Sequence, residues 1–290
     1  MISVITPVYN GEQFIEACIK VIIDQNCPDV EHIIVDGAST DKTVDIIKLY
    51  ADIYPHIRWI SEKDKGQSDA MNKGVAMAKG EIISFLNVDD FYQPNVLNRA
   101  LEIFPRLPVP SILLGNCNLW DSKTKLVAVH KPANFTLSSM LQGLNETNFP
   151  TNPSAYFYHT CLHQQVGMYK IDEHYAMDLD FLLRAVQVAK ITYINESWGN
   201  WMRLENTKSM TLWQNEERGY QLIDGILRYY RKDLPLLQRW LITIIYESNI
   251  LWHRKLKWKF KYYIKHYLLT PQNILHKLRS NFKKLLSIGT

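Results

Sequence analysis

An apolar run that ends in acidic and amide side chains lies near residue 85 of this 290-residue chain. The segment Ser84-Phe-Leu-Asn-Val-Asp-Asp-Phe-Tyr92 leaves its apolar core at Asn87, Asp89 and Asp90. Hard divalent cations take oxygen ligands and keep part of their shell for water and substrate phosphates, so such carboxylates suit a metal–diphosphate complex. A structural alternative stays open, in which Asp90 caps the following helix and Asp89 starts a turn, because aspartate is favoured in both places.

Two more polar clusters follow apolar runs. Pro7-Val-Tyr-Asn-Gly11 comes after the first run and Asp36-Gly-Ala-Ser-Thr-Asp41 after the second, and either Thr40 or Asp41 can cap the next helix. A purely structural turn would have a similar sequence. The chain contains neither G-x-G-x-x-G after its first run nor G-x-x-x-x-G-K-[ST], which disfavours a dinucleotide-binding fold and a P-loop NTPase. Any phosphate must be held in another way.

Four apolar runs predict the strands that position these clusters. They cover residues 2–6, 32–35, 57–60 and 82–86, and the intervals between the first runs show helical spacing. Alternating strands and helices predict βα crossovers and a mainly parallel sheet flanked by helices, which is an α/β, Rossmann-like fold. Ligands of such sheets bind beyond the carboxyl ends of the strands. We therefore expect three adjacent loops to line one pocket.

The remaining chain is less periodic. Residues 107–153 predict irregular strands and loops that complete the sheet and shape an acceptor groove, and helical patterns dominate from Gln214 onward. Pro235 and Pro271 predict breaks between helices. The expected organisation is a catalytic domain over residues 1–212 and a helical, basic region over residues 213–290.

Composition and cysteine use indicate a cytoplasmic globular protein. A hydrophobic content of 47% supports a substantial core. The four cysteines form no C-x-x-C pair and no disulfide framework, which fits a reducing compartment. Met1 leads directly into Ile-Ser-Val-Ile, with no basic or long apolar segment before it, so secretion is not expected.

The charge is unevenly distributed. The net charge is +4, but residues 248–290 hold ten Lys or Arg and no Asp or Glu, so the first 247 residues hold 23 basic and 29 acidic residues. Residues 253–286 interleave these cations with aromatic side chains, a composition that suits an anionic membrane surface. Nucleic-acid binding is the rival use of such charge, but no recognition motif supports it. A solvated helical face packed on the catalytic domain is the third reading.

The order of these motifs resembles that of the inverting family 2 glycosyltransferases of GT-A fold, over about residues 1–210. The matching segments are Thr6-Pro-Val-Tyr-Asn10, Val35-Asp-Gly-Ala-Ser-Thr-Asp-Lys-Thr43, Glu62-Lys-Asp-Lys-Gly66 with Asp69-Ala-Met-Asn-Lys-Gly74, Phe85-Leu-Asn-Val-Asp-Asp90, and Tyr175-Ala-Met-Asp-Leu-Asp-Phe-Leu-Leu-Arg184. Each segment alone is a modest signal, whereas five in the family's order and spacing are specific.

The resemblance implies transfer of a sugar from a nucleotide-diphosphate donor, for which we expect a UDP-sugar, to an acceptor hydroxyl. Asp36 would bind the base. The positions expected to bind the donor are Pro7, Tyr9, Asp36, Asp64, Gly66, Asp69, Asn72, Asn87 and Asp89.

The resemblance also implies a divalent cation, Mg²⁺ or Mn²⁺, bridging the diphosphate. Asp89 matches the second carboxylate of the family's Asp-x-Asp element, and Asn87 replaces the first. Further along, Glu205 occupies the place where the family often has a histidine that approaches the diphosphate and the metal. Either Glu205 is an oxygen ligand of the metal or that role has been lost.

Asp178 matches the family's general base, because a hydroxyl is a poor nucleophile until a carboxylate takes its proton. Asp180 could orient Asp178, bind the acceptor, or pair with Arg184 four residues later on a helix, and we favour the pairing.

The expected protein is thus a cytoplasmic, metal-dependent glycosyltransferase of the hexosyltransferase type, peripheral on the inner face of the cell membrane and active in cell-surface polysaccharide assembly. Its partners would be a nucleotide-sugar donor, a glycan or lipid-linked glycan acceptor and, through residues 253–286, an anionic membrane; no nucleic-acid partner is expected. Because of Asn87 and Glu205, a second hypothesis is a nucleotide-sugar or glycan-binding module of the same fold that has lost turnover.

Overall fold

The structure is a computed structural model that describes residues 1–122, 124–145, 147–173, 175–204 and 216–248. The chain divides into two compact units, Met1–Asp233 and Leu234–Thr290. The helix Glu216–Arg231 belongs to the first unit, although the sequence placed it in a separate C-terminal region that starts at residue 213.

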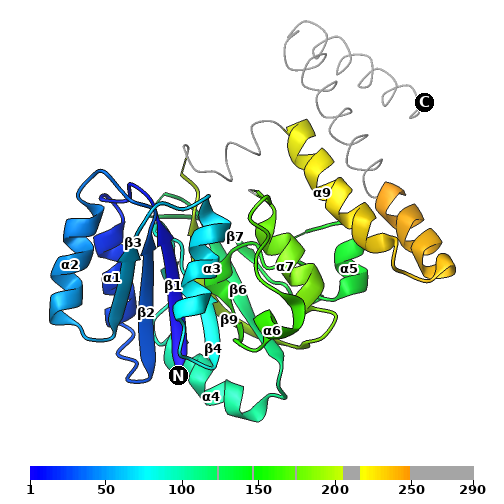
Figure 1. Cartoon of the computed structure of the whole chain (residues 1–290). Helices are drawn as coiled ribbons and strands as arrows, with labels where there is room; N and C mark the ends of the chain where they lie inside the picture. Colours follow the sequence, from blue (N-terminus) through cyan, green and yellow to red (C-terminus); the bar gives the residue numbers. More distant parts are fainter. Residues whose placement is uncertain (123, 146, 174, 205–215, 249–290) are drawn as a thin grey trace, which may run out of the picture. The chain divides into compact units, whose positions relative to one another are not determined.

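The first unit is built on one sheet, which has nine strands among the described residues (Figure 1). Their order is β3-β2-β1-β4-β8-β6-β9-β5, with β7 paired to β6. The strands are β1 (Ile2–Val8), β2 (Val30–Asp36), β3 (Ile57–Ser61), β4 (Ile82–Phe85), β5 (Phe91–Tyr92), β6 (Ser111–Ser122), β7 (Lys125–His130), β8 (Tyr156–His159) and β9 (Lys190–Met202).

Helices connect and flank these strands. The helices of the first unit are α1 (Ile15–Ile23), α2 (Thr43–Ile53), α3 (Gln67–Met77), α4 (Val96–Ile103), α5 (Leu137–Leu141), α6 (Leu162–Val166), α7 (Met177–Ala185) and α9 (Glu216–Arg231), with short 3₁₀ turns η1 (Phe104–Arg106) and η2 (Pro153–Ala155). In the second unit, residues 236–248 are helical.

The four predicted strands are confirmed as β1 to β4, each with ends close to those expected. Their pairings, β1 with β2, β1 with β4 and β2 with β3, are all parallel, as βα crossovers require. Beyond β4 the sheet is mixed, because β8 runs antiparallel to both β4 and β6 while β6 and β9 are parallel. The expected parallel pairing therefore holds for β1 to β4 and for β6 with β9, and the other pairings are antiparallel.

The core lies on both faces of the sheet. On one face α1 buries the apolar stripe Ile15, Cys18, Ile19 and Ile22, which has the spacing of one helix side. The other face of β1 meets α3, where a Cβ added to Gly74 would lie 2.3 Å from Cγ2 of Ile5. Helices on both faces of a sheet with parallel βα units confirm the predicted α/β class.

Two further features bear on the expectations from sequence. Among the residues that the structure describes, no helix is long and apolar enough to cross a membrane. Cys18, Cys27, Cys117 and Cys161 are free thiols.

Candidate donor-binding and catalytic site

Backbone and side-chain hydrogen bonds join the loop after β1 to the loop after β2. The Asn10 N–H donates to Oγ of Ser39 at 2.7 Å, and the Thr40 N–H donates to Oδ1 of Asn10 at 2.9 Å. Next along the chain, the Gly11 N–H donates to Oγ1 of Thr43 at 2.9 Å. The two polar clusters that the sequence singled out therefore form one surface at the carboxyl end of the sheet.

Asp41 strengthens this connection and holds the start of α2. Its Oδ2 accepts from the Glu12 N–H and its Oδ1 from the Thr43 N–H, both at 3.0 Å. Thr43 is the first residue of α2, so Asp41 satisfies a donor that the helix leaves unpaired. The N-cap residue of α2 is Lys42 and not the expected Asp41, which accepts from the first helical N–H from one position earlier and also contacts the first loop.

Asp36 ends β2 with a fully buried carboxylate. Oδ2 of Asp36 accepts from the Ser39 N–H at 3.0 Å and from the Ser61 hydroxyl at 2.6 Å, and its Oδ1 accepts from the Ser39 hydroxyl. These bonds fix the loop after β2 and the end of β3. The predicted contact of Asp36 with the base stays a prediction.

Two of the predicted donor-binding residues, Tyr9 and Asp64, meet around Gly37. A Cβ added to Gly37 would lie 2.6 Å from Oδ2 of Asp64 and 3.5 Å from Cδ2 of Tyr9, so the loop after β2 lies directly against both side chains. The Tyr9 ring is 63% exposed, which leaves a face free to stack on a planar group. The third predicted residue of this loop, Pro7, is buried within β1, opposite Val35 of β2.

Asp64 also shapes the start of α3. Its Oδ1 accepts from the Gly66 N–H at 2.9 Å, and Gly66 has φ of 113°, a conformation that side-chain-bearing residues rarely adopt. The predicted positions Asp69 and Asn72 on α3 also make protein contacts. Oδ2 of Asp69 accepts from the Lys65 N–H at 3.0 Å, and Asn72 exchanges two hydrogen bonds with the backbone of Tyr169, at 2.8 and 2.9 Å. Their donor contacts stay predictions.

The loop after β4 lies beside α3 and the first loop. Nε2 of Gln67 donates to Oδ1 of Asn87 at 3.2 Å, and Nδ2 of Asn87 donates to Oδ2 of Asp90 at 2.9 Å. On the other side, a Cβ on Gly11 would lie 3.5 Å from Cγ2 of Val88. The loops after β1, β2 and β4, and the start of α3, thus converge as the topology predicts.

Asp90 is a buried structural link, and the idea that it caps a helix is wrong. Phe91 begins β5, and α4 starts only at Val96. Oδ2 of Asp90 accepts from Nδ2 of Asn152 at 2.7 Å, and its Oδ1 accepts from the Met202 N–H at 3.4 Å. Asp90 therefore ties the loop after β4 to the N-terminal side of η2 and to the end of β9.

Asp89, half-buried beside Asp90, is the carboxylate that fits a divalent cation. Burial raises the pKa of Asp89, and burial followed by the charge of Asp89 raises the pKa of Asp90. A nearby cation would reverse both effects by favouring the ionised forms. Since the oxygens of Asp90 already accept from protein groups, the donor set is the one carboxylate of Asp89, and diphosphate oxygens and water would supply the remaining ligands that Mg²⁺ or Mn²⁺ takes.

The second predicted metal ligand, Glu205, is not tested by the structure. The described residues contain no group of three or more His, Cys, Asp and Glu side chains that could hold a metal ion by themselves. Glu205 lies outside the described residues, as does the basic segment 253–286, so both assignments stay predictions.

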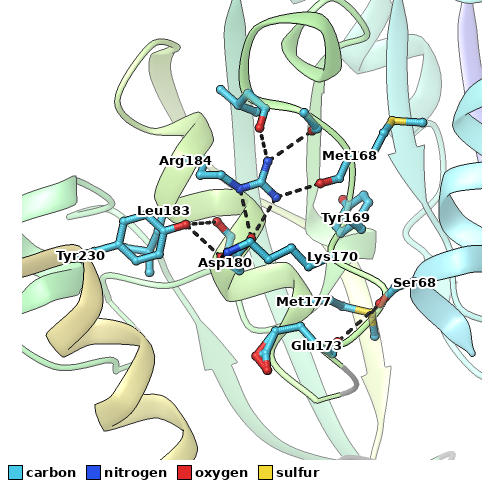
Figure 2. A network of polar contacts seen from close by, with 12 residues as sticks. Ser68, Met168, Tyr169, Lys170, Glu173, Met177, Asp180, Leu183, Arg184 and Tyr230 are labelled. Carbon is cyan, nitrogen blue, oxygen red and sulfur yellow. Dashed lines mark hydrogen bonds and ion pairs between the residues drawn. The ribbon is translucent and has the colours of Figure 1, made fainter.

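Asp178 lies in the first turn of α7, beside α3. Oγ of Ser68 contacts Sδ of Met177 at 2.9 Å and the carbonyl oxygen of Glu173 at 3.4 Å, so α3 fixes where α7 begins (Figure 2). After burial, the charge of Asp178 helps to raise the pKa of Tyr156, which places its half-buried carboxylate near β8. An acidic side chain in a first helical turn is favoured by the helix dipole.

Asp180 is the centre of a polar network that holds α7 (Figure 2). Its buried carboxylate accepts from Nζ of Lys170 at 2.6 Å, from Arg184 at 2.9 Å, and from the Tyr230 hydroxyl at 2.9 Å. The predicted pairing with Arg184 is confirmed. Arg184 also donates to backbone carbonyls of residues 166–168. The network therefore joins α7 to the loop after α6 and to α9.

Sequence reasoning missed Lys170, Tyr230, Gln67 and Asn152. Lys170 and Tyr230 lie 10 and 50 residues from Asp180, and Asn152 lies 62 residues from Asp90. Contacts at such separations leave no periodicity in one sequence. Gln67 lies between the matching segment that ends at Gly66 and the one that begins at Asp69.

Comparison with known proteins gives consistent results. The family model "Glycosyl transferase family 2" matches residues 3–159. The uncharacterized glycosyltransferase EpsJ of Bacillus subtilis is 28% identical over 218 residues, covering 73% of this chain and 63% of EpsJ. Chondroitin synthase of Escherichia coli is 34% identical over 129 residues, 44% of this chain and 19% of that protein. The chain thus spans less than two thirds of either relative.

Solved structures share the fold at low identity. S. aureus TarS in complex with UDP-GlcNAc superposes with a TM-score of 0.63 at 20% identity, over 84% of this chain and 71% of TarS. The mannosyltransferase PcManGT of Pyrobaculum calidifontis, in complex with GDP-Man and Mn²⁺, gives a TM-score of 0.56 at 17% identity, over 84% and 72% of the two chains.

Proposed function

Because this chain belongs to glycosyl transferase family 2, we propose that it transfers a sugar from a nucleotide-diphosphate donor to an acceptor hydroxyl. The GT-A fold expected from sequence is confirmed by the similarity to TarS. The observation that carries the proposal is the convergence of the loops after β1, β2 and β4 on one edge of the sheet, with Tyr9, Asp64 and Asp89 at that edge.

The donor we propose is a UDP-sugar. Tyr9 offers an exposed ring for the base, and Asp64 lies beside it across Gly37, where a carboxylate can accept from a base or ribose donor. The TarS complex with UDP-GlcNAc supports this choice, whereas the PcManGT complex with GDP-Man makes the guanine nucleotide the alternative to exclude.

The cation we propose is Mg²⁺ or Mn²⁺, held by Asp89 and by oxygens of the donor. Such an ion supplies positive charge that offsets charge developing on the leaving diphosphate. The chain contributes the position of Asp89, which Asp90 fixes through its bonds to Asn152 and Met202. The Mn²⁺ in the PcManGT complex supports this assignment.

Asp178 is the proposed general base. Its carboxylate takes the proton of the acceptor hydroxyl as the new bond to the anomeric carbon forms, because an unassisted hydroxyl is a weak nucleophile. Attack from the face opposite the diphosphate breaks the bond to the leaving group in the same displacement and inverts the anomeric carbon. The contacts of Ser68 with Met177 and Glu173 join the start of α7, which carries Asp178, to the first turn of α3, and this supports the proposal.

The proposed setting is assembly of a cell-surface polysaccharide on the inner face of the cell membrane, with a glycan or lipid-linked glycan as acceptor. The similarity to chondroitin synthase, whose name denotes a polysaccharide product, supports the polymer context. The ten cations and no acidic residues of 248–290 support contact with an anionic membrane.

Release of nucleoside diphosphate by the full chain tests the activity. A panel of UDP-, GDP- and dTDP-sugars is assayed with Mn²⁺, and donor binding is measured in parallel by thermal shift. Asp178→Asn should keep donor binding and lose transfer by about 10²–10⁴-fold, the usual contribution of a general base. The matched control is Asp172→Asn, which makes the same substitution at an exposed aspartate six residues earlier and should behave as the parent chain.

The outcome separates the two hypotheses. Donor binding without turnover, in the parent chain and with every acceptor tried, would favour the nucleotide-sugar or glycan-binding module. Full transfer by both Asp89→Asn and Asp178→Asn would reject the assignment of the site.

A further inference from the structure

The helix formed by residues 236–248 in the second unit exposes large apolar side chains to solvent. Six of its side chains are each 39 to 75% exposed, and all six are aliphatic or indole groups. These residues, named here the apolar face, are Leu236, Leu237, Trp240, Leu241, Ile244 and Ile245. Scattered apolar residues are common on protein surfaces, whereas a contiguous patch marks a binding site.

The spacing makes the apolar face continuous. Residues 236, 240 and 244 form one i, i+4 row and residues 237, 241 and 245 form the next, so the six side chains lie on two adjacent rows of one helix side. Ile242 and Tyr246, on the opposite side of this helix, are buried. An apolar stripe along one side of a helix is normally packed against another surface. The apolar face is therefore expected to have an occupant.

Charge in the sequence selects among the occupants. The helix itself contains only Arg239 and Glu247 as charged residues, but the segment that follows it contains ten Lys or Arg and no acidic residue. A second copy of the chain on the apolar face would bring two such cationic segments together, and their repulsion opposes the pairing. An anionic bilayer attracts them instead, and Trp240 is the side-chain type that concentrates at membrane interfaces.

We propose that the apolar face of residues 236–248 inserts into the boundary between headgroups and acyl chains of an anionic bilayer. The positive charge of the sequence that follows favours an anionic over a neutral bilayer. This inference extends the membrane contact of the proposed function by assigning an apolar bilayer contact to residues 236–248. It does not depend on sugar transfer.

Sedimentation of the full chain with vesicles tests the inference. The vesicles are phosphatidylcholine alone or phosphatidylcholine with phosphatidylglycerol, each at about 0.1 M and about 0.5 M NaCl, because salt screens headgroup attraction but not apolar insertion. The variant is Leu237→Gln/Leu241→Gln. Its control, Leu49→Gln/Ile53→Gln on α2, changes two residues that are also four apart and 59 and 60% exposed.

The expected result is specific to the apolar face. The Leu237/Leu241 variant should bind phosphatidylglycerol vesicles about tenfold more weakly or worse at both salt concentrations, because each leucine loses its transfer into the bilayer. The Leu49/Ile53 control should bind as the parent chain does. Circular dichroism spectra and melting curves verify that both variants fold.

Three results would overturn the inference. These are a parent chain that does not bind anionic vesicles, a Leu237/Leu241 variant that binds them equally well, and a variant that changes only the oligomeric state in light scattering, which would assign the apolar face to a second copy. Nucleotide release is measured on the same variant with a water-soluble acceptor. Intact transfer with lost vesicle binding separates this inference from the proposed catalytic function.

Discussion

Replacing Asp180 by asparagine tests whether the buried network of Figure 2 holds α7 in place. The substitution keeps the shape of the side chain, removes its charge, and points an amide donor at cations that themselves donate. Of its partners, Lys170 is 52% exposed, so that pair contributes little. Arg184 is only 17% exposed and is the partner that decides the outcome.

The magnitude follows from what each partner loses. Removing one member of a buried ion pair costs about 3–5 kcal/mol. Arg184 keeps its bonds to the carbonyls of residues 166–168, which lowers this figure, whereas the loss of the charged acceptor weakens the bond from Tyr230. We expect a net loss of about 2–4 kcal/mol in the free energy of unfolding, or a melting temperature lower by about 5–12 °C for a chain of this size.

Thermal and urea unfolding, followed by circular dichroism, measure this loss. Glu16→Gln is the matched control, because Glu16 also bonds a lysine, Lys20 at 2.6 Å, and a tyrosine hydroxyl, Tyr50 at 2.9 Å, but lies exposed on α1. The control should leave the melting temperature unchanged. An unchanged melting temperature for Asp180→Asn as well would refute the reasoning that burial makes this network strong.

Three further outcomes are expected. Burial lowers the pKa of His32 to about 3 and of His163 to about 4. Between pH 7 and pH 5 these histidines therefore take up protons in the unfolded chain but not in the folded chain. The free energy of unfolding should fall by about 2 kcal/mol for each histidine over this range. Equal urea midpoints at the two pH values would contradict this. Gly37→Ala should weaken donor binding several-fold while the melting curve stays cooperative, because its Cβ would lie 2.6 Å from Oδ2 of Asp64; calorimetric titration with the donor measures the change. Chelation of divalent ions should abolish nucleotide release, and added Mn²⁺ should restore it, whereas full activity in the chelator would show that Asp89 works without a cation.

The sequence predicted well that the loops after β1, β2 and β4 converge, because the rule behind this convergence is local. A polar cluster after a buried strand lies at the carboxyl edge of a parallel sheet, and Asn10, Asp41 and Asn87 all make their contacts there. The pairing of Asp180 with Arg184 was predictable for the same reason, since residues four apart on a helix are neighbours.

What the sequence did not reveal depends on residues far apart in the chain. The insertion of β8 between β4 and β6 reverses the strand direction, and no spacing within residues 82–159 indicates it. The partner of Asp180 on α9 is equally distant, because Tyr230 looks like any aromatic residue of an amphipathic helix until the chain folds. Long-range side-chain contacts of this kind require coordinates.

The buried bonds of Asp90 have a consequence for how the binding of one substrate affects the affinity for the other. They join the loop of Asp89 to Asn152 and to the last residue of β9. A molecule that shifts one of these segments must therefore move the others or break a buried hydrogen bond. Breaking such a bond costs about 1–3 kcal/mol. An acceptor that contacts residues near Asn152 would then alter affinity for the donor, and thermodynamic reciprocity requires the converse. Titrating donor in the presence and absence of saturating acceptor would reveal this communication as a change in dissociation constant, and identical constants would show that the two sites are independent.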